Sequence, residues 1–180
     1  MHASLHRRGR IALGSALAAV LASAALAAAS TPAHALVDAA CLGSETNSFS
    51  PGLTNTLAPH DVTYSASLRC LSLTDPAIRG ASVSGFVSGA LRSCTSLLNV
   101  NTTTADLTWN TGERSVMTTV FTPNYADGQL IIVGAGTITS GKFAGSAVAS
   151  VEAVVADLLQ CSQPGGLTRL DGSWRLDVAL

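Results

Sequence analysis

The amino-acid sequence predicts an all-β protein: a single antiparallel domain of about eight strands, with an up-and-down β-barrel favoured over a β-sandwich. Three observations carry this prediction. Residues 104–145 alternate between polar and apolar side chains and contain two tight-turn signals. Further short alternating stretches, separated by turn residues, recur along the rest of the chain. The last of them, residues 173–180, ends the chain on a strand.

Residues 103–110 predict the first of three consecutive strands in this central stretch. The less polar side chains of Ala105, Leu107 and Trp109 occupy every second position, so they share one face. Turn residues at 110–112 then interrupt the pattern. The alternation therefore indicates a strand with one apolar face, followed by a tight turn.

Residues 114–122 predict the second strand, because threonine and valine dominate them and both are common in strands. Pro123 is expected to end this strand, since proline has no backbone N–H to donate. Asp127 and Gly128 are a strong signal for a two-residue hairpin. Residues 129–140 follow as the third strand.

Three more strands are expected before the central stretch, at residues 45–56, 61–70 and 81–94. The first contains Pro51, which predicts an edge strand or a bulge at that point. We interpret residues 36–43 as a short lead-in. The residues between these strands, including Pro59 and His60, are expected to be turns.

Residues 146–160 carry a mixed signal. Their alanine, leucine and glutamate residues favour helix, whereas their valines favour strand. The hairpins that precede them favour a strand, with a short helical turn at residues 157–160. The rival architecture for the whole domain is an immunoglobulin-type sandwich, but no tryptophan lies between the first three of the four cysteines considered below.

Residues 1–35 are interpreted as a secretory signal peptide. Arg7, Arg8 and Arg10 precede an apolar run rich in alanine and leucine, and Ala33-His34-Ala35 resembles a cleavage site. The alternative is an uncleaved membrane anchor, because the run is nearly long enough to span a bilayer. Cleavage after residue 35 leaves one domain, residues 36–180, and predicts a secreted, extracellular protein without a further membrane span.

The predicted mature chain is mildly acidic. Residues 36–180 hold eleven acidic and seven basic side chains, a formal charge of −4, and the charges are scattered. Proteins that bind nucleic acids usually carry a clustered basic surface. No nucleic-acid partner is therefore expected.

Four cysteines lie in the mature chain: Cys41, Cys70, Cys94 and Cys161. An even number in an exported protein indicates disulfide bonds. In an up-and-down meander, Cys41 and Cys70 lie at one end of the sheet, and Cys94 and Cys161 lie at the other. Strand parity therefore predicts the pairs Cys41–Cys70 and Cys94–Cys161.

Several short motifs resemble those of small secreted actinobacterial proteins with two disulfides. They are Cys41-Leu-Gly, Phe49-Ser-Pro-Gly-Leu53, Ser93-Cys94, Leu107-Thr-Trp-Asn-Thr-Gly112, residues 136–145 and Cys161 followed by Pro164-Gly165. The resemblance covers the whole mature chain. It implies export, disulfides and a β fold, and it assigns no catalytic residue.

The sequence offers little catalytic chemistry. No serine lies in a nucleophile elbow, and no CxxC pair is present to hold a metal. His60 is the only histidine of the mature chain, and we expect it to be solvated or to cap a turn. The acidic residues are interpreted as solubilising groups on polar faces or in turns: Asp106, Glu113, Asp127, Asp171 and Asp177. No enzyme activity, cofactor or metal is predicted.

Two functions are favoured on this basis, and an enzyme that uses His60, an isomerase or a hydrolase, is the third alternative. The first is a secreted, non-enzymatic domain with a structural, cell-surface or protein-interaction role and an unknown partner. The second is a barrel that binds a small molecule or a carbohydrate. Trp109 and Trp174 lie on apolar faces and are expected in the core, but in a closed barrel they are the candidates to line an internal pocket.

Overall fold

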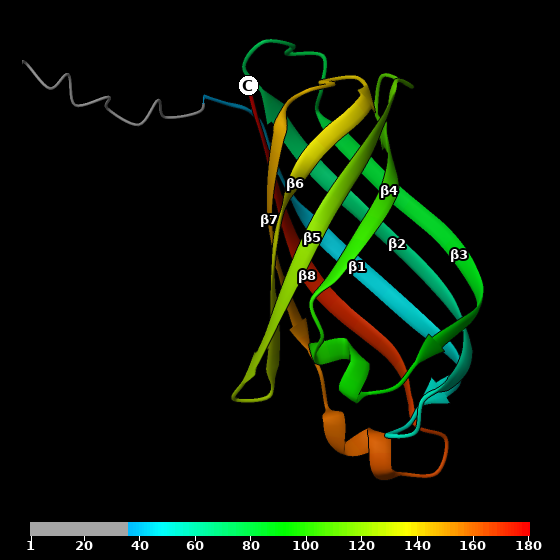
Figure 1. The fold of residues 1–180 in the computed structure, drawn as a ribbon. Coiled ribbons are helices and arrows are strands. Elements are labelled where there is room, and N and C mark those ends of the chain that lie inside the picture. The colour runs from blue at the N-terminus through cyan, green and yellow to red at the C-terminus, as the bar shows by residue number, and fades with distance from the viewer. Residues whose placement is uncertain (1–35) are drawn as a thin grey trace, which may run out of the picture. The chain divides into compact units, whose positions relative to one another are not determined.

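The structure is a computed structural model of the chain, and it describes residues 36–180. The predicted signal peptide, residues 1–35, lies outside the described residues. Eight antiparallel strands form one closed up-and-down barrel (Figure 1), which confirms the predicted fold class. The strands are β1 (Val37–Leu53), β2 (Ala58–Ser72), β3 (Gly80–Arg92), β4 (Asn101–Trp109), β5 (Arg114–Ala126), β6 (Gln129–Gly141), β7 (Ala147–Val155) and β8 (Leu167–Ala179).

Each strand pairs with its neighbours in sequence, and β8 pairs with both β7 and β1, which closes the barrel. Buried and exposed side chains alternate along much of β2, β7 and β8, as the pleat requires. Two short 3-10 helices, η1 (Thr95–Leu98) and η2 (Leu158–Ser162), lie at the end of the barrel opposite the C-terminus (Figure 1). We call this the helical end. Among residues 36–180, no helix is long and apolar enough to cross a membrane.

The other end of the barrel, which we call the plugged end, is filled by side chains. Trp109 is 2% exposed, and its ring meets the Phe143 ring edge-on with 5.1 Å between centroids. The Trp109 indole Nε1–H donates to Ser115 Oγ at 2.8 Å. Ile78, 1% exposed, belongs to the same cluster of buried side chains. Trp109 is therefore part of a packed core, as its position on an apolar face predicts.

Replacing Trp109 with phenylalanine is expected to lower the free energy of unfolding by about 1–3 kcal/mol, because it removes a buried hydrogen bond and leaves a small void. Urea unfolding measures this loss. The matched control is Phe86→Leu on β3, which changes an aromatic side chain that is 63% exposed and should have almost no effect. Equal effects of the two substitutions would contradict the assignment of Trp109 to the core.

Three predicted boundaries are wrong. Residues 36–43 are largely strand: β1 begins at Val37 and pairs with β2 and β8. Residues 59 and 60 also belong to a strand, β2, which begins at Ala58. Pro123 does not end β5, which continues to Ala126. At that point β5 pairs only with β6, because its pairing with β4 stops at Phe121, and a free strand edge tolerates proline.

Other local predictions are confirmed. A register shift between Ser48 and Leu53 marks the bulge expected near Pro51. Asp127 and Gly128 form the β5–β6 hairpin turn, both with positive φ, at 53° and 77°. The predicted helical turn after β7 is present as η2.

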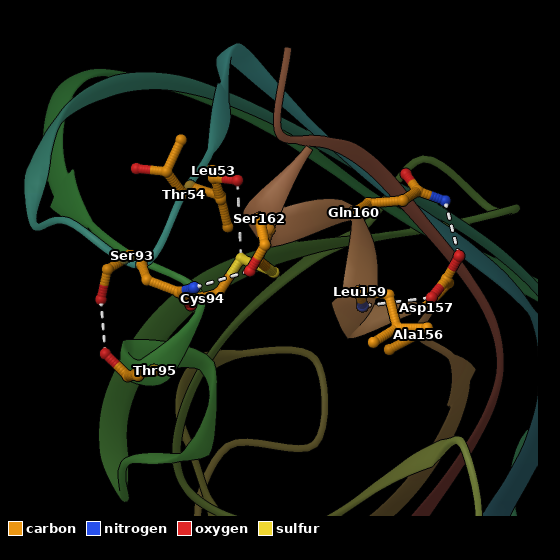
Figure 2. Close-up of a disulfide and its surroundings, with 12 residues drawn as sticks. Leu53, Thr54, Ser93, Cys94, Thr95, Ala156, Asp157, Leu159, Gln160 and Ser162 are labelled. Carbon is orange, nitrogen blue, oxygen red and sulfur yellow. Dashed lines mark hydrogen bonds between the residues drawn. A yellow bond between two sulfur atoms is a disulfide. The ribbon is translucent and has the colours of Figure 1, made fainter. Parts of the chain in front are cut away.

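Disulfides join Cys41 to Cys70 and Cys94 to Cys161, the pairs that strand parity predicts. Cys41 and Cys70 lie directly opposite each other on β1 and β2, among the buried side chains that extend to the plugged end. The second disulfide links the residue before η1 to η2 (Figure 2). The backbone N–H of Cys94 also donates to the Thr54 carbonyl oxygen at 2.8 Å, so η1 is attached at its start to two other segments of the helical end.

Candidate functional site: a central cavity

The buried side chains of the barrel form two clusters. The larger includes Leu107, Trp109 and Leu176, and the smaller includes Phe49 and Leu130 together with the Cys94–Cys161 disulfide. A cavity of about 340 Å³ is lined by members of both clusters. Its volume falls in the range of small-molecule sites, which begins at roughly 300 Å³.

The wall of the cavity is mainly apolar toward the helical end. Five of the side chains that line it there belong to the smaller cluster or pack against it: Phe49, Leu97, Leu130, Val154 and Leu170. Four of them are inward-facing side chains of the strands β1, β6, β7 and β8, and Leu97 belongs to η1. The helical end therefore supplies an apolar pocket within the cavity.

The cavity opens through the wall between β3 and β4. These strands pair only at Ala81–Trp109, Ser82–Thr108 and Val83–Leu107, and they diverge beyond that point (Figure 1). The unpaired parts of both strands border the cavity. Its lining includes Val87 and Ala90 from β3 and Thr103 from β4.

Two features identify this gap as the mouth of the cavity. Thr103 and Thr104 lie on opposite faces of β4, yet both line the cavity, as expected of a free strand edge. Val87 is 47% exposed although it lines the cavity. Ser96 and Leu97 of η1 line the same region, so the Cys94–Cys161 disulfide holds one side of the mouth.

The middle of the cavity is polar and is dominated by two acidic side chains. Glu45 of β1 and Glu152 of β7 both line it. Glu152 lies directly opposite Trp174 of β8 in the sheet, and Glu45 lies opposite Gly172 of the same strand. A Cβ atom at position 172 would lie 3.2 Å from Glu45 Oε1, so the glycine leaves the space that the Glu45 carboxyl occupies.

Both carboxyl groups hold protons more strongly than exposed glutamates do. Burial raises the pKa of Glu152 to about 8, and repulsion by the nearby Glu45 adds to this effect. Burial also raises the pKa of Glu45 to about 7, partly offset by its interaction with Glu152. The pair therefore binds at least one proton through much of the neutral range. This proton is shared by the two carboxyl groups and is not assigned to either one.

Several further polar atoms in the barrel interior have no hydrogen-bond partner in the described chain. They are Glu45 Oε1, Thr119 Oγ1, Ser150 Oγ and Trp174 Nε1. Thr119, Ser150 and Trp174 are 1%, 3% and 5% exposed. Buried polar groups are almost always paired with protein, water or ligand. Glu45, Thr119 and Trp174 line the cavity, so the cavity presents both donors and acceptors to whatever occupies it.

The structure separates the two predicted pocket residues. Trp174 lines the cavity, beside the two glutamates. Trp109 does not line it and belongs to the plugged end. Tyr64 of β2 lines the cavity as well. Only one of the two tryptophans is therefore in a position to contact a ligand.

His60 is not solvated, which corrects the sequence-based interpretation. It is 3% exposed within β2, and its Nδ1–H donates to the Pro51 carbonyl oxygen at 2.7 Å. It is not among the residues that line the cavity. This hydrogen bond ties β2 to the irregular part of β1, which gives His60 a structural contact outside the cavity.

Glu45 and Glu152 are the polar residues that sequence reasoning missed. The sequence did contain a signal for their inward position. Glu45 is an even number of residues away from the apolar Cys41 and Phe49, and Glu152 is an even number of residues away from Val148 and Val154. In a strand, such residues share a face. The expectation that acidic residues lie on outer faces holds for the exposed Asp106 but not for these two.

No group of three or more histidine, cysteine, aspartate or glutamate side chains that could hold a metal ion occurs among residues 36–180. The geometry is that of a partly open apolar cavity with an acidic pair at its centre. Comparisons of the chain with protein-family models, with curated proteins and with solved structures find no match.

Proposed function

We propose that the protein binds a small, largely apolar molecule inside the barrel. The observation that carries this proposal is the cavity of about 340 Å³, with its mainly apolar wall and its opening between β3 and β4. Apolar pockets of this size with a few inward-facing polar groups are the usual form of small-molecule sites. The buried polar atoms without protein partners, such as Trp174 Nε1 and Thr119 Oγ1, support a ligand that carries a polar group.

Filling part of the cavity is expected to weaken binding. Ala105 of β4 lines the cavity near its mouth, so Ala105→Phe places a ring in the space that the ligand needs. We expect isothermal titration calorimetry with phenylbutanol, a neutral apolar probe, to give an affinity about tenfold weaker for this variant than for the wild type.

The matched control for this experiment is Ala149→Phe. Ala149 is exposed on the outer face of β7, so the same substitution there adds a ring outside the barrel. Its affinity for phenylbutanol should equal that of the wild type. An Ala105→Phe protein that folds and binds phenylbutanol as tightly as the control would refute binding in the cavity.

A protein-interaction role is the second candidate. It is favoured by exposed apolar side chains on β3 and in the segment that leads to β4, namely Phe86, Leu91, Leu98 and Val100. Surface groups of this kind often mark contact sites when they form a continuous patch. Changing Phe86 and Leu91 to serine should leave the cavity intact, so the double variant separates surface binding from ligand binding in the interior.

A further inference from the structure

The acidic pair in the cavity has no basic partner. The ion pairs among residues 36–180 all lie elsewhere, at Asp75, Glu113, Asp171 and Asp177. Arg92 is the only basic side chain that lines the cavity, and it lies exposed at the end of β3. Two buried carboxyl groups without a positive partner are costly to ionise. Their chemistry therefore favours a ligand that brings the missing positive charge.

The geometry around the pair fits such a charge. Glu45 and Glu152 approach from β1 and β7, on either side of β8, and the absence of a side chain at Gly172 leaves room for the Glu45 carboxyl group there. The Glu45 Oε1 atom has no hydrogen-bond partner in the described chain. Trp174 and Tyr64, which also line the cavity, add aromatic rings of the kind that attract cations.

The remaining wall defines the other part of the ligand. Toward the helical end the cavity is lined by Phe49, Leu130, Val154 and Leu170, which offer no charged group. A molecule that spans the cavity therefore meets carboxyl groups at one point and an apolar pocket beyond them.

We propose that the cavity is specific for an organic ammonium compound, with its charged nitrogen between Glu45 and Glu152 and its apolar body in the pocket at the helical end. This inference rests on the proposed function, since it names the ligand class of the same cavity. Neutral and anionic molecules of the same shape bind more weakly, because they leave the carboxyl pair without a counter-charge.

Binding of the cation is coupled to proton release. The free pair binds at least one proton near pH 7, and an ammonium group next to it favours the ionised form of both carboxyl groups. Ammonium affinity should therefore rise between pH 6 and pH 8.5. The other titratable side chains that line the cavity are Tyr64 of β2 and Arg92 of β3.

The test compares three probes of one shape: phenylbutylamine, phenylbutanol and phenylbutyrate. Isothermal titration calorimetry of the wild-type protein at pH 8 should give an affinity for the amine about tenfold higher than for the alcohol, and the acid should bind most weakly. Repeating the amine titration in buffers of different ionisation enthalpy measures the protons released. A net release of protons is expected.

The double variant Glu45→Gln/Glu152→Gln should bind the amine and the alcohol equally well, because the amides keep the shape of the site and remove its charge. Asp106→Asn is the matched control: it removes one acidic group from the outer face of β4 and should leave the preference for the amine intact. If this control loses the preference, the effect comes from the net charge of the protein and the inference fails.

The remaining outcomes separate this inference from the proposed function. If phenylbutanol binds in the cavity and phenylbutylamine binds no better, the ammonium inference is wrong and the proposed function stands. The inference is also overturned if the double glutamine variant keeps the amine preference. If none of the three probes binds, the proposed function fails, and the inference fails with it.

Discussion

The free energy of unfolding is expected to fall by about 2–5 kcal/mol as the pH rises from 5.5 to 8.5. The cause is the buried pair of Glu45 and Glu152, whose folded-state pKa values are raised to about 7 and about 8. In the unfolded chain both glutamates ionise near pH 4.5, the value for an unperturbed side chain. Between these limits the folded protein binds more protons than the unfolded chain, so stability decreases with pH and levels off above about pH 9, once Glu152 has also ionised.

Urea unfolding at a series of pH values measures this slope. In the variant Glu45→Gln/Glu152→Gln the slope should largely disappear, and at pH 8.5 the variant should be more stable than the wild type, because neutral amides cost less to bury than ionised carboxylates. Asp106→Asn should keep the wild-type slope. The pKa of Asp171, lowered to about 2 by hydrogen bonds from Arg169 and Thr46, affects stability only at pH values below this range.

A constant or rising unfolding free energy across this range would contradict the burial of the acidic pair. A double glutamine variant whose unfolding free energy depends on pH as steeply as that of the wild type would also contradict it, because the protons would then be bound elsewhere in the chain.

Removing the disulfide at the helical end is expected to cost about 4 kcal/mol of unfolding free energy. Cys94 and Cys161 are 67 residues apart in the sequence, so their bond closes a long loop in the unfolded chain and reduces its conformational entropy. Urea unfolding of Cys94→Ala/Cys161→Ala measures the loss. A loss below about 1 kcal/mol would contradict this account of the disulfide.

The same variant should change the mouth of the cavity. Cys94 lies immediately before η1, and Ser96 and Leu97 of η1 line the cavity. Backbone amides of residues 95–101 should exchange hydrogen faster than in the wild type, and phenylbutanol should bind more weakly. The control is Cys41→Ala/Cys70→Ala, which removes a bond between directly paired strands and should leave exchange at η1 unchanged.

Much of the fold follows from the period of two in the sequence. Polar and apolar residues alternate along β4. The dipeptide Asp127-Gly128 predicts a hairpin turn in which both residues have positive φ, and both do. Because the connections are short, strand parity also places the four cysteines in two pairs.

The errors arise where local sequence signals compete with pairing. The first residues of β1 have weak strand propensity, and their strand is imposed by the two neighbours β2 and β8. Pro123 is tolerated because β5 has a free edge there, a fact that depends on where β4 begins. Neither fact is visible from a short window of sequence.

The site was harder to predict than the fold. Alternation assigns Glu45 and Glu152 to the inner face, but charged side chains are usually exposed, and that expectation favours the opposite interpretation. The gap between β3 and β4 depends on the three-dimensional course of two strands that both read as ordinary strands. The cavity becomes evident only when the closed barrel brings these features together.

Ligand binding inside the barrel is tested most directly by the fluorescence of Trp174 during a titration. The chain has two tryptophans, so Trp109→Phe leaves the indole in the cavity as the only one. Added phenylbutylamine should shift its emission with saturation at one ligand per chain, and the additional substitution Ala105→Phe should move saturation to a concentration about tenfold higher. Emission that does not change while calorimetry detects binding would place the ligand outside the barrel and contradict the account.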